Sequence, residues 1–346
     1  MGMTQAIYEH ESRTALFAVA RAARLCRAVQ REIKAEILAK NDQSPVTIAD
    51  FGSQALIGQT LAQAFPGDPI LAEENSSDLV KPENEPLLSR ATEYFTRFST
   101  DEGREPTAAK TTTPGARESL IQCLDHGAAD HGGKRFWTVD PIDGTKGFLR
   151  GGQYAVALAL IVDGRVVVAA LACPNLDFRP ASNKPGTLFY AIRGAGAYMI
   201  SEDQAHQANP TAERIRVSDR DDLRFAQYCE SYESSHSAQD ESATIAKRLG
   251  ITSPSLRMDS QAKYAVVARG EADLYLRLPT RKDYREKIWD HAAGALLVEE
   301  AGGTVTDIVG RPLEFHHGRE LLANKGVVVS NGRLHRAVLE AIAEQL

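Results

Sequence analysis

Residues 137–148 read Trp137-Thr138-Val139-Asp140-Pro141-Ile142-Asp143-Gly144-Thr145-Lys146-Gly147-Phe148. The apolar residues before Asp140 are typical of a strand end, and we expect Pro141 to stop the strand's hydrogen bonding and fix a turn. Gly144 lets the backbone approach a ligand closely, and Thr145 adds a hydroxyl and a backbone N–H at an expected helix start, which suits an anion. The stretch therefore predicts a turn that directs Asp140 and Asp143 into the same space.

Two carboxylates that share a space repel each other unless a cation lies between them, and Mg²⁺ is the hard cation that prefers oxygen ligands. The simpler interpretation is an Asp-rich surface turn, because turns favour Asp and Gly. Three further segments weigh against it, since each carries an acid after an apolar stretch. They are Pro45–Asp50, which ends in Asp50; Pro69–Asn75, which contains Glu73 and Glu74; and Lys287–Gly294, which contains Asp290.

Each of these acids also has a simpler interpretation when it is taken alone. Asp50 and Asp290 could be helix N-caps, and Glu73 and Glu74 could be a solvated pair. Four strand or turn ends that carry acids, in a chain of alternating elements, favour one shared site. Its proposed ligands are all oxygen donors, a set that selects Mg²⁺, Mn²⁺ or Ca²⁺ over zinc. Paired divalent ions of this kind are a known solution to phosphate-ester hydrolysis.

Composition is that of an ordinary soluble globular protein, with 43% hydrophobic and 25% charged residues in 346. The net charge of −6 argues against a general nucleic-acid binder, whose domain would be basic. A small phosphorylated substrate remains compatible with this charge, because metals can invert the local field. The four cysteines show no metal-type spacing, and they predict mostly buried, reduced thiols.

No stretch reaches the roughly 18 apolar residues that a membrane span requires. The longest apolar run, Tyr154–Val162, has the length of a strand. The first residues lack the basic start and apolar core of a secretory signal, and we expect a cytoplasmic protein that contacts no membrane.

The first half of the chain predicts helices before the Asp140 turn and strands after it. We expect helices over residues 5–40, 52–65, 86–98 and 114–125, and a strand at 70–72 that leads to Glu73. Residues 76–135 interrupt the pattern, and the polar stretch 99–113 within them is expected to be mobile. Two strands, 154–162 and 165–172, are joined by Asp163-Gly164, a two-residue hairpin signal. A further strand is expected at 188–192.

After residue 200 the pattern mixes both types. We expect strands near 214–217, 225–229, 273–276 and 303–306, and helices near 240–248, 260–268, 289–301 and 333–345. The fold class is therefore α/β of the α+β type, arranged as a layered α/β/α/β/α sandwich. We divide the chain into a metal-binding α+β domain, residues 1–200, with its insertion at 76–135, and an α/β domain, residues 201–346.

The four acidic segments, taken in order, resemble a known superfamily. They read Thr-Ile-Ala-Asp50, Leu-Ala-Glu73-Glu74, Asp140-Pro-Ile-Asp143-Gly-Thr145 and Trp-Asp290-His-Ala-Ala-Gly. This set is similar to that of the magnesium-dependent, lithium-sensitive phosphatases, which include inositol monophosphatase and fructose bisphosphatase. Residues 140–176 and 258–279 resemble most closely the 3'(2'),5'-bisphosphate nucleotidase branch. The resemblance runs from about residue 10 to the end of the chain, and it implies the same layered sandwich, with the insertion beside the site and shaping its mouth.

The resemblance implies a role for each matched residue. The metal ligands are Glu73, Asp140, Asp143 and Asp290, with the backbone carbonyl of Ile142. Asp50 and Thr145 orient and deprotonate the attacking water. An alcohol is too weak a base alone, so Asp50 is the natural partner of Thr145. Glu74 is left open between a metal contact and a supporting role, and we expect His291 to help order the helix start.

Substrate contacts are implied away from the metals. The matched positions are Thr145, His236, Ser260, Lys263, Arg277 and Asp290. Ser260 and Lys263 stand three apart at an expected helix start, so both can face one ligand. Arg277 at a strand end could form a bidentate clamp on phosphate. Tyr264 and Tyr284 could stack on adenine, although no spacing argument supports either.

The implied activity is removal of the 3'-phosphate from adenosine 3',5'-bisphosphate, giving AMP and phosphate. It extends to 3'-phosphoadenylyl sulfate and to the clearing of a by-product of sulfate assimilation. The implied cofactor is Mg²⁺, with two or three ions in the site, Mn²⁺ as a substitute, and Li⁺, Na⁺ and Ca²⁺ as inhibitors. We expect a monomer that binds no nucleic-acid polymer. The alternatives are an inositol phosphate phosphatase and a sensor that binds the nucleotide without turning it over.

Overall fold

The computed structural model describes residues 7–33, 44–99, 114–205, 211–232, 239–279, 281 and 283–345. Within these residues two sheets form. The larger sheet follows the chain in strand order, with β1 parallel to β2 and each later pair antiparallel. Its strands are β1 (Ile70–Ala72), β2 (Arg135–Asp143), β3 (Ala155–Val162), β4 (Arg165–Asp177), β5 (Pro185–Ile192), β6 (Gly196–Ser201) and β7 (Glu213–Ile215).

The smaller sheet belongs to the second half of the chain and has the strand order β11-β12-β10-β8-β9. Its central strand β10 pairs antiparallel with β12 and parallel with β8. The strands are β8 (Tyr228–Glu230), β9 (Leu256–Arg257), β10 (Leu274–Arg277), β11 (Thr304–Thr306) and β12 (Val327–Ser330).

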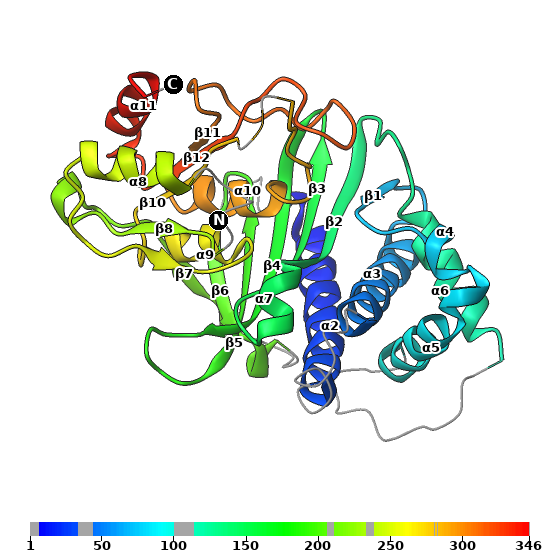
Figure 1. Ribbon diagram of the computed structural model, residues 1–346. Helices are drawn as coiled ribbons and strands as arrows, with labels where there is room; N and C mark the ends of the chain where they lie inside the picture. The colour runs from blue at the N-terminus through cyan, green and yellow to red at the C-terminus, as the bar shows by residue number, and fades with distance from the viewer. Residues whose placement is uncertain are drawn as a thin grey trace.

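Helices complete a five-layer stack. Helices α2 (Glu9–Ile33) and α3 (Ser44–Ala64) cover one face of the larger sheet, as Figure 1 shows in blue. Helices α9 (Ala262–Ala268) and α10 (Ala292–Glu300) lie between the two sheets, and α8 (Gln239–Arg248) and α11 (His335–Ala343) cover the outer face of the smaller sheet. The expected α/β/α/β/α sandwich is confirmed.

Alternation along β3 shows how the larger sheet supports two layers. Val156, Leu158 and Leu160 face the cluster under α2 and α3, whereas Ala157 and Ile161 face the cluster between the sheets. A strand buried on both faces is apolar throughout because successive side chains point to opposite sides. Helix α10 is also buried on all sides. Its residues 292–298 are all buried because the helix lies between the two sheets and packs against both.

Several expected elements differ from the structure at their ends. Helix α3 begins at Ser44, so Asp50 lies inside a helix, and neither the expected strand end nor the N-cap interpretation of Asp50 is correct. Strand β2 does not stop at Pro141; it continues to Asp143 with a shift in register between Asp140 and Asp143. Such an irregularity accommodates a proline, which has no N–H to donate. Strand β12 was not predicted.

The interrupting segment 76–135 contributes short helices beside α3: α4 (Ser76–Leu79), η2 (Pro82–Asn84), α5 (Glu85–Ser99) and α6 (Ala116–His126). Residues 100–113 lie outside the described residues, so the expected mobility of that stretch stays a prediction.

Cys26, Cys173 and Cys229 are buried and Cys123 is half-buried, as expected. The domain boundary near residue 200 also stays a prediction. The described helices include none that combines the length and the apolar character needed to cross a membrane.

Candidate active site

A cavity of about 520 Å³ opens where β2 ends, between residues of the larger sheet and residues of the smaller one. Most of the expected site residues line it together: Glu73, Asp140, Ile142, Asp143, Thr145, Ser260, Lys263, Arg277 and Asp290. Two expected members do not. Asp50 lines a neighbouring cavity of about 240 Å³, and His236 lies outside the described residues.

The ends of two adjacent parallel strands bring the first acids together. Strand β1 ends at Ala72, and the Glu73 N–H donates to the Val139 carbonyl of β2 at 3.3 Å. Asp140 and Asp143 follow on β2 itself. Parallel strands end at the same edge of a sheet, so acids placed after each of them meet.

The turn after Asp143 depends on Gly144. Its φ of +87° lies in the left-handed region, and helix α7 (Thr145–Arg150) begins at the next residue. A Cβ at Gly144 would lie 2.9 Å from the Cβ of Ser260, closer than such atoms come in proteins. The glycine therefore allows both the turn and the close approach of the segment that carries Ser260.

Several acids in the cavity have raised pKa values. The pKa of Glu73 is raised to about 8, first by enclosure in the protein and then by Asp290, Glu74 and Asp143, against a hydrogen bond with Asp140 that lowers it. Asp140 is buried, and burial together with Glu73 and Asp143 holds its pKa well above the usual range. Burial raises the pKa of Asp290 to about 6, with Arg277 acting in the opposite direction. Burial and mutual repulsion thus make all three carboxyls resist ionisation.

Two observations indicate that these residues can bind divalent cations. Oxygen Oδ1 of Asp140 is buried and has no hydrogen-bond partner among the described residues. The donors that converge on the cavity are carboxylates and the carbonyl of Ile142, the ligand chemistry of Mg²⁺ and Mn²⁺. A cation at this position would satisfy the orphaned oxygen and would offset both the burial and the repulsion that raise the pKa values.

Asp50 approaches the acids from the other side. It lines the smaller cavity with Glu74 and residues of the interrupting segment, such as Asp78 and Asn84. Burial raises the pKa of Asp50 well above the usual range, and Glu74 and Glu73 raise it further. The Thr145 hydroxyl faces the main cavity and lies 3.5 Å from the Ile142 carbonyl. The pairing of Asp50 with Thr145 stays a prediction, and the described part of 76–135 lines the smaller cavity, not the larger one.

The opposite wall is basic. Lys263 on α9 is buried, its Nζ lies 3.3 Å from the Met258 carbonyl and 5.1 Å from the centre of the Tyr275 ring, and burial lowers its pKa while Asp143 raises it. Arg277, the last residue of β10, lies 3.5 Å from Asp290. Its Nε lies 2.7 Å from a carboxylate oxygen of Glu286. The cavity is therefore lined by two cationic side chains as well as by the acids, with Arg277 directly beside Asp290.

His291 occupies the N-cap position of α10, but its side chain makes no cap hydrogen bond. Its Nδ1 lies 2.7 Å from the Tyr264 hydroxyl and its Nε2 lies 3.1 Å from Glu286. Asp290 precedes the cap, so the N-cap interpretation of Asp290 is wrong. Tyr264 is buried behind this network, while Tyr284 is half-buried in the cavity wall, 3.4 Å from Arg277.

Three residues outside the predicted set also hold the site, and the sequence interpretation missed them. The Gln54 side chain accepts from the Glu74 N–H at 3.0 Å and donates to the Glu74 carbonyl at 2.7 Å. The Ser53 hydroxyl donates to the Pro141 carbonyl at 3.0 Å. The Arg319 guanidinium donates to the Ala72 carbonyl. No motif or spacing indicates these contacts, because each joins elements distant in the sequence.

Comparison with known proteins agrees with this geometry. The family model described as "Inositol monophosphatase family" matches residues 4–346. The chain belongs to the inositol monophosphatase family. The resemblance stated from the acidic segments is therefore confirmed.

Curated members of this family are similar over nearly the whole chain. A "3'(2'),5'-bisphosphate nucleotidase" of Emericella nidulans is 44% identical, over 98% of this chain and 99% of its own. Proteins of the same name from Schizosaccharomyces pombe and Oryza sativa are 43% and 42% identical, over 97% and 98% of this chain and 96% and 95% of their own. These relatives confirm the resemblance to the nucleotidase branch.

Solved structures of the inositol monophosphatase family share the fold. An inositol monophosphatase from Anabaena (Nostoc) sp. PCC 7120 has a TM-score of 0.60 at 20% identity and covers 97% of this chain and 96% of its own. Mycobacterium tuberculosis SuhB has a TM-score of 0.60 at 23% identity, with 96% of each chain covered. At this identity the likeness concerns the fold alone.

Proposed function

We propose that the chain is a Mg²⁺-dependent phosphomonoesterase that hydrolyses the 3'-phosphate of adenosine 3',5'-bisphosphate to AMP and phosphate. One observation carries the proposal: a single cavity is lined by the acids Glu73, Asp140, Asp143 and Asp290 and also by the cations Lys263 and Arg277. A substrate with two phosphates fits such a cavity, because one phosphate can be cleaved among cations that the acids hold while Lys263 and Arg277 bind the other. The names of the relatives point to the same substrate class.

The metal ligands in this proposal are Glu73, Asp140, Asp143, Asp290 and the carbonyl of Ile142, with Mg²⁺ as the cation, two or three ions in the site, and Mn²⁺ as a substitute. When bound, such ions neutralise the carboxylates, favour hydroxide over water and stabilise charge on the leaving oxygen. Li⁺, Na⁺ and Ca²⁺ are proposed to inhibit by competing at these positions.

The chain's own residues perform the remaining tasks. The Thr145 hydroxyl orients the attacking water, and Asp50 receives its proton. The water oxygen forms a bond to phosphorus in line with the ester bond, which breaks and releases the sugar oxygen. Ser260, Lys263, Arg277 and His236 hold the rest of the nucleotide, and the cavity walls align the phosphate with the attacking water.

Activity on 3'-phosphoadenylyl sulfate and a role in sulfur metabolism extend the same proposal, as do a cytoplasmic location and a monomeric state. The second candidate is an inositol phosphate phosphatase, which would use the same metal ligands on a polyol phosphate. The cationic wall favours the nucleotide, since an inositol monophosphate would leave Lys263 and Arg277 without a phosphate partner. A non-catalytic sensor is the third, and the complete acid set in the cavity disfavours it.

The test is phosphate release, with Mg²⁺ and with EDTA, from adenosine 3',5'-bisphosphate, inositol 1,4-bisphosphate and fructose 1,6-bisphosphate. Fast, EDTA-sensitive release from the nucleotide is expected. Release mainly from inositol or fructose phosphates would overturn the substrate assignment and keep the metal site. Tight metal-free binding of the nucleotide with no release from any substrate would establish the sensor instead.

Variants then test the assigned roles. Asp143→Asn and Thr145→Ala should each abolish turnover while circular dichroism shows a retained fold. Asp163→Asn is the matched control, because Asp163 is exposed in the β3–β4 turn with φ +47°, a conformation that asparagine also adopts. Normal turnover in either of the first two variants would refute the mechanism.

A further inference from the structure

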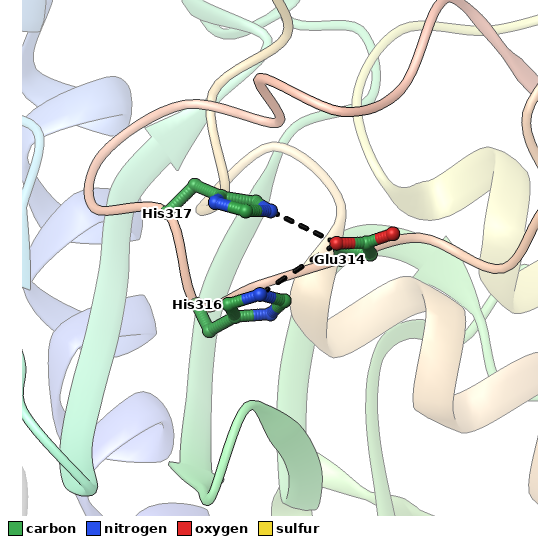
Figure 2. Close-up of side chains that lie close together, drawn as sticks. All are labelled: Glu314, His316 and His317. Carbon is green, nitrogen blue, oxygen red and sulfur yellow. Dashed lines mark hydrogen bonds and ion pairs between the residues drawn. The ribbon is translucent and has the colours of Figure 1, made fainter.

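A second group of possible metal ligands lies in the connection between β11 and β12, outside the candidate active site. It consists of Glu314, His316 and His317, and Figure 2 shows both imidazole rings beside the one carboxylate. A Glu314 oxygen lies 2.9 Å from Nε2 of His317 and 3.6 Å from Nε2 of His316. The two rings lie 4.0 Å apart, tilted by 37°.

From this geometry we propose that Glu314, His316 and His317 form a binding site for a borderline divalent transition metal such as Zn²⁺. Two imidazoles and a carboxylate are typical zinc ligands, whereas Mg²⁺ prefers oxygen donors alone. Tetrahedral zinc with bonds of 2.0–2.1 Å holds neighbouring ligand atoms about 3.3 Å apart. The two separations from Glu314 lie on either side of this value, each within a few tenths of an ångström, and the three residues offer ligand atoms that all lie within 4.8 Å of one another.

The segment that carries the ligands is fixed at three points, which favours a preorganised site. The Glu314 N–H donates to the side chain of Asn324 at 2.8 Å, and buried Asn324 in turn donates to the Pro312 carbonyl at 2.9 Å. His316 packs on Gly164 of the β3–β4 turn: a Cβ added to Gly164 would lie 3.1 Å from the Cβ of His316. On the other side, Arg319 anchors the chain to the Ala129 carbonyl at 3.2 Å.

The site is also open to an ion. The side chains of Glu314, His316 and His317 are 43%, 53% and 32% exposed, so a hydrated ion reaches them without any opening of the fold. With three protein ligands, one coordination position would remain for water. The other His-containing group in the described residues, Glu286, Asp290 and His291, differs because Tyr264 and Glu286 already engage both nitrogens of its histidine.

The alternative is a pair of surface ion pairs with no metal, and metal binding by the untagged, full chain distinguishes the two. Calorimetric titration with Zn²⁺, in millimolar Mg²⁺ that fills the oxygen-donor site, should show one additional equivalent bound. His317→Gln and Glu314→Gln should each weaken this binding by about tenfold or more, and His316→Gln/His317→Gln together should abolish it. Zn²⁺ should also raise the Tm of the wild type but not that of the double variant.

His131→Gln is the matched control, because His131 is an exposed histidine beside Gly318 that does not belong to the group. Its Zn²⁺ binding should equal that of the wild type. No binding by the wild type in the presence of Mg²⁺, or undiminished binding by the double variant, would overturn the proposal. Nucleotidase activity does not enter these measurements, so their outcome is independent of the proposed function.

Discussion

Gly144 is the residue on which both the turn and the width of the cavity depend. It separates Asp143 from Thr145, adopts φ +87° and lies against Ser260 on the opposite wall. Any side chain at this position would disturb the backbone of the acidic end and push against the segment that carries Ser260. A mutation here therefore tests geometry without removing any proposed ligand.

We expect Gly144→Ala to lower kcat/KM by about a hundredfold, since a displacement of about 1 Å at an active site has such an effect. Gly133→Ala is the control: it has φ +67° but nothing within 4 Å of its Cβ position, so it should lose only about 1–2 kcal/mol of stability from backbone strain. Steady-state kinetics and denaturant unfolding of both variants measure the two effects. Equal kinetics for the two would show that contact with Ser260 is unimportant.

Arg319 connects segments that precede two of the proposed metal ligands. Its guanidinium donates to the carbonyl of Ala72, the residue before Glu73, and lies 4.6 Å from the ring centre of Trp289, the residue before Asp290. Its own carbonyl accepts from the Ile288 N–H at 3.2 Å. The side chain thus links the end of β1 to the segment before α10, and it is not part of the cavity lining, which makes Arg319 a positioning residue.

Arg319→Met should raise the Mg²⁺ concentration needed for half-maximal activity by about tenfold, because Glu73 and Asp290 lose their fixed separation. The KM for the nucleotide at saturating Mg²⁺ should change little, since the basic wall is untouched. Arg336→Met, which removes a highly exposed arginine from α11, is the control. The assignment fails if Mg²⁺ dependence in R319M matches that of the control.

At the scale of elements, helix α3 fixes both acidic strand ends. Asp50, Ser53 and Gln54 lie within one turn of the helix, and Ser53 and Gln54 bond the backbones of Pro141 and Glu74. The Gln54 side chain bonds both the N–H and the carbonyl of Glu74, so the backbone just after β1 has hydrogen-bond partners although the strand has ended. Helix α3 therefore holds in place the backbone segments that carry the acids at the ends of β1 and β2.

Gln54→Leu leaves both Glu74 backbone groups without their partner. The expected cost is about 1–3 kcal/mol for each buried group, together with a loss of kcat, because the acids after β1 are no longer held. Gln63→Leu makes the same exchange at an exposed position of the same helix and should change neither the free energy of unfolding nor kcat. Denaturant unfolding and kinetics check this; full stability in Q54L would mean that water replaces the amide without loss.

The sequence predicted most of these elements but not how they meet. The hairpin of β3 and β4 and the buried helix α10 follow from turn chemistry and apolar periodicity. The start of α3 does not, because Pro45-Val46-Thr47-Ile48 has the β-branched composition of a strand and becomes helical through packing against α2. Pro141 was expected to end β2, yet a register shift absorbs it. The contacts of Gln54 and Arg319 depend on tertiary structure alone, so no local pattern could indicate them.

At the scale of the whole molecule, the five-layer stack gathers acids that the chain scatters over residues 50 to 290. Strand ends of the larger sheet supply Glu73, Asp140 and Asp143, and the connection before α10 supplies Asp290. Folding therefore concentrates negative charge that the unfolded chain keeps apart and solvated. The stability of the protein should depend on what neutralises that charge.

Without metal, the protein should lose stability as pH rises from about 4.5 to 8. Glu73 has a folded-state pKa of about 8 against 4.5 for an ordinary glutamate, so over this window the folded state binds a proton that the unfolded state has released. Stability then falls with rising pH, by at most about 1.4 kcal/mol per pH unit for each such group. Mg²⁺ replaces the proton, so the increase in Tm that Mg²⁺ produces over EDTA should grow across the same window.

Thermal unfolding between pH 5 and 8.5, with Mg²⁺ and with EDTA, measures this linkage. Glu73→Gln should flatten the pH dependence in EDTA, because an amide cannot ionise, and should reduce the gain from Mg²⁺. Glu118→Gln, at an exposed position of α6, should behave as the wild type does. An effect of Mg²⁺ that stays constant from pH 5 to 8.5 would show that the acids are neutralised by something other than the cation, and it would remove the main physical argument for a metal in this cavity.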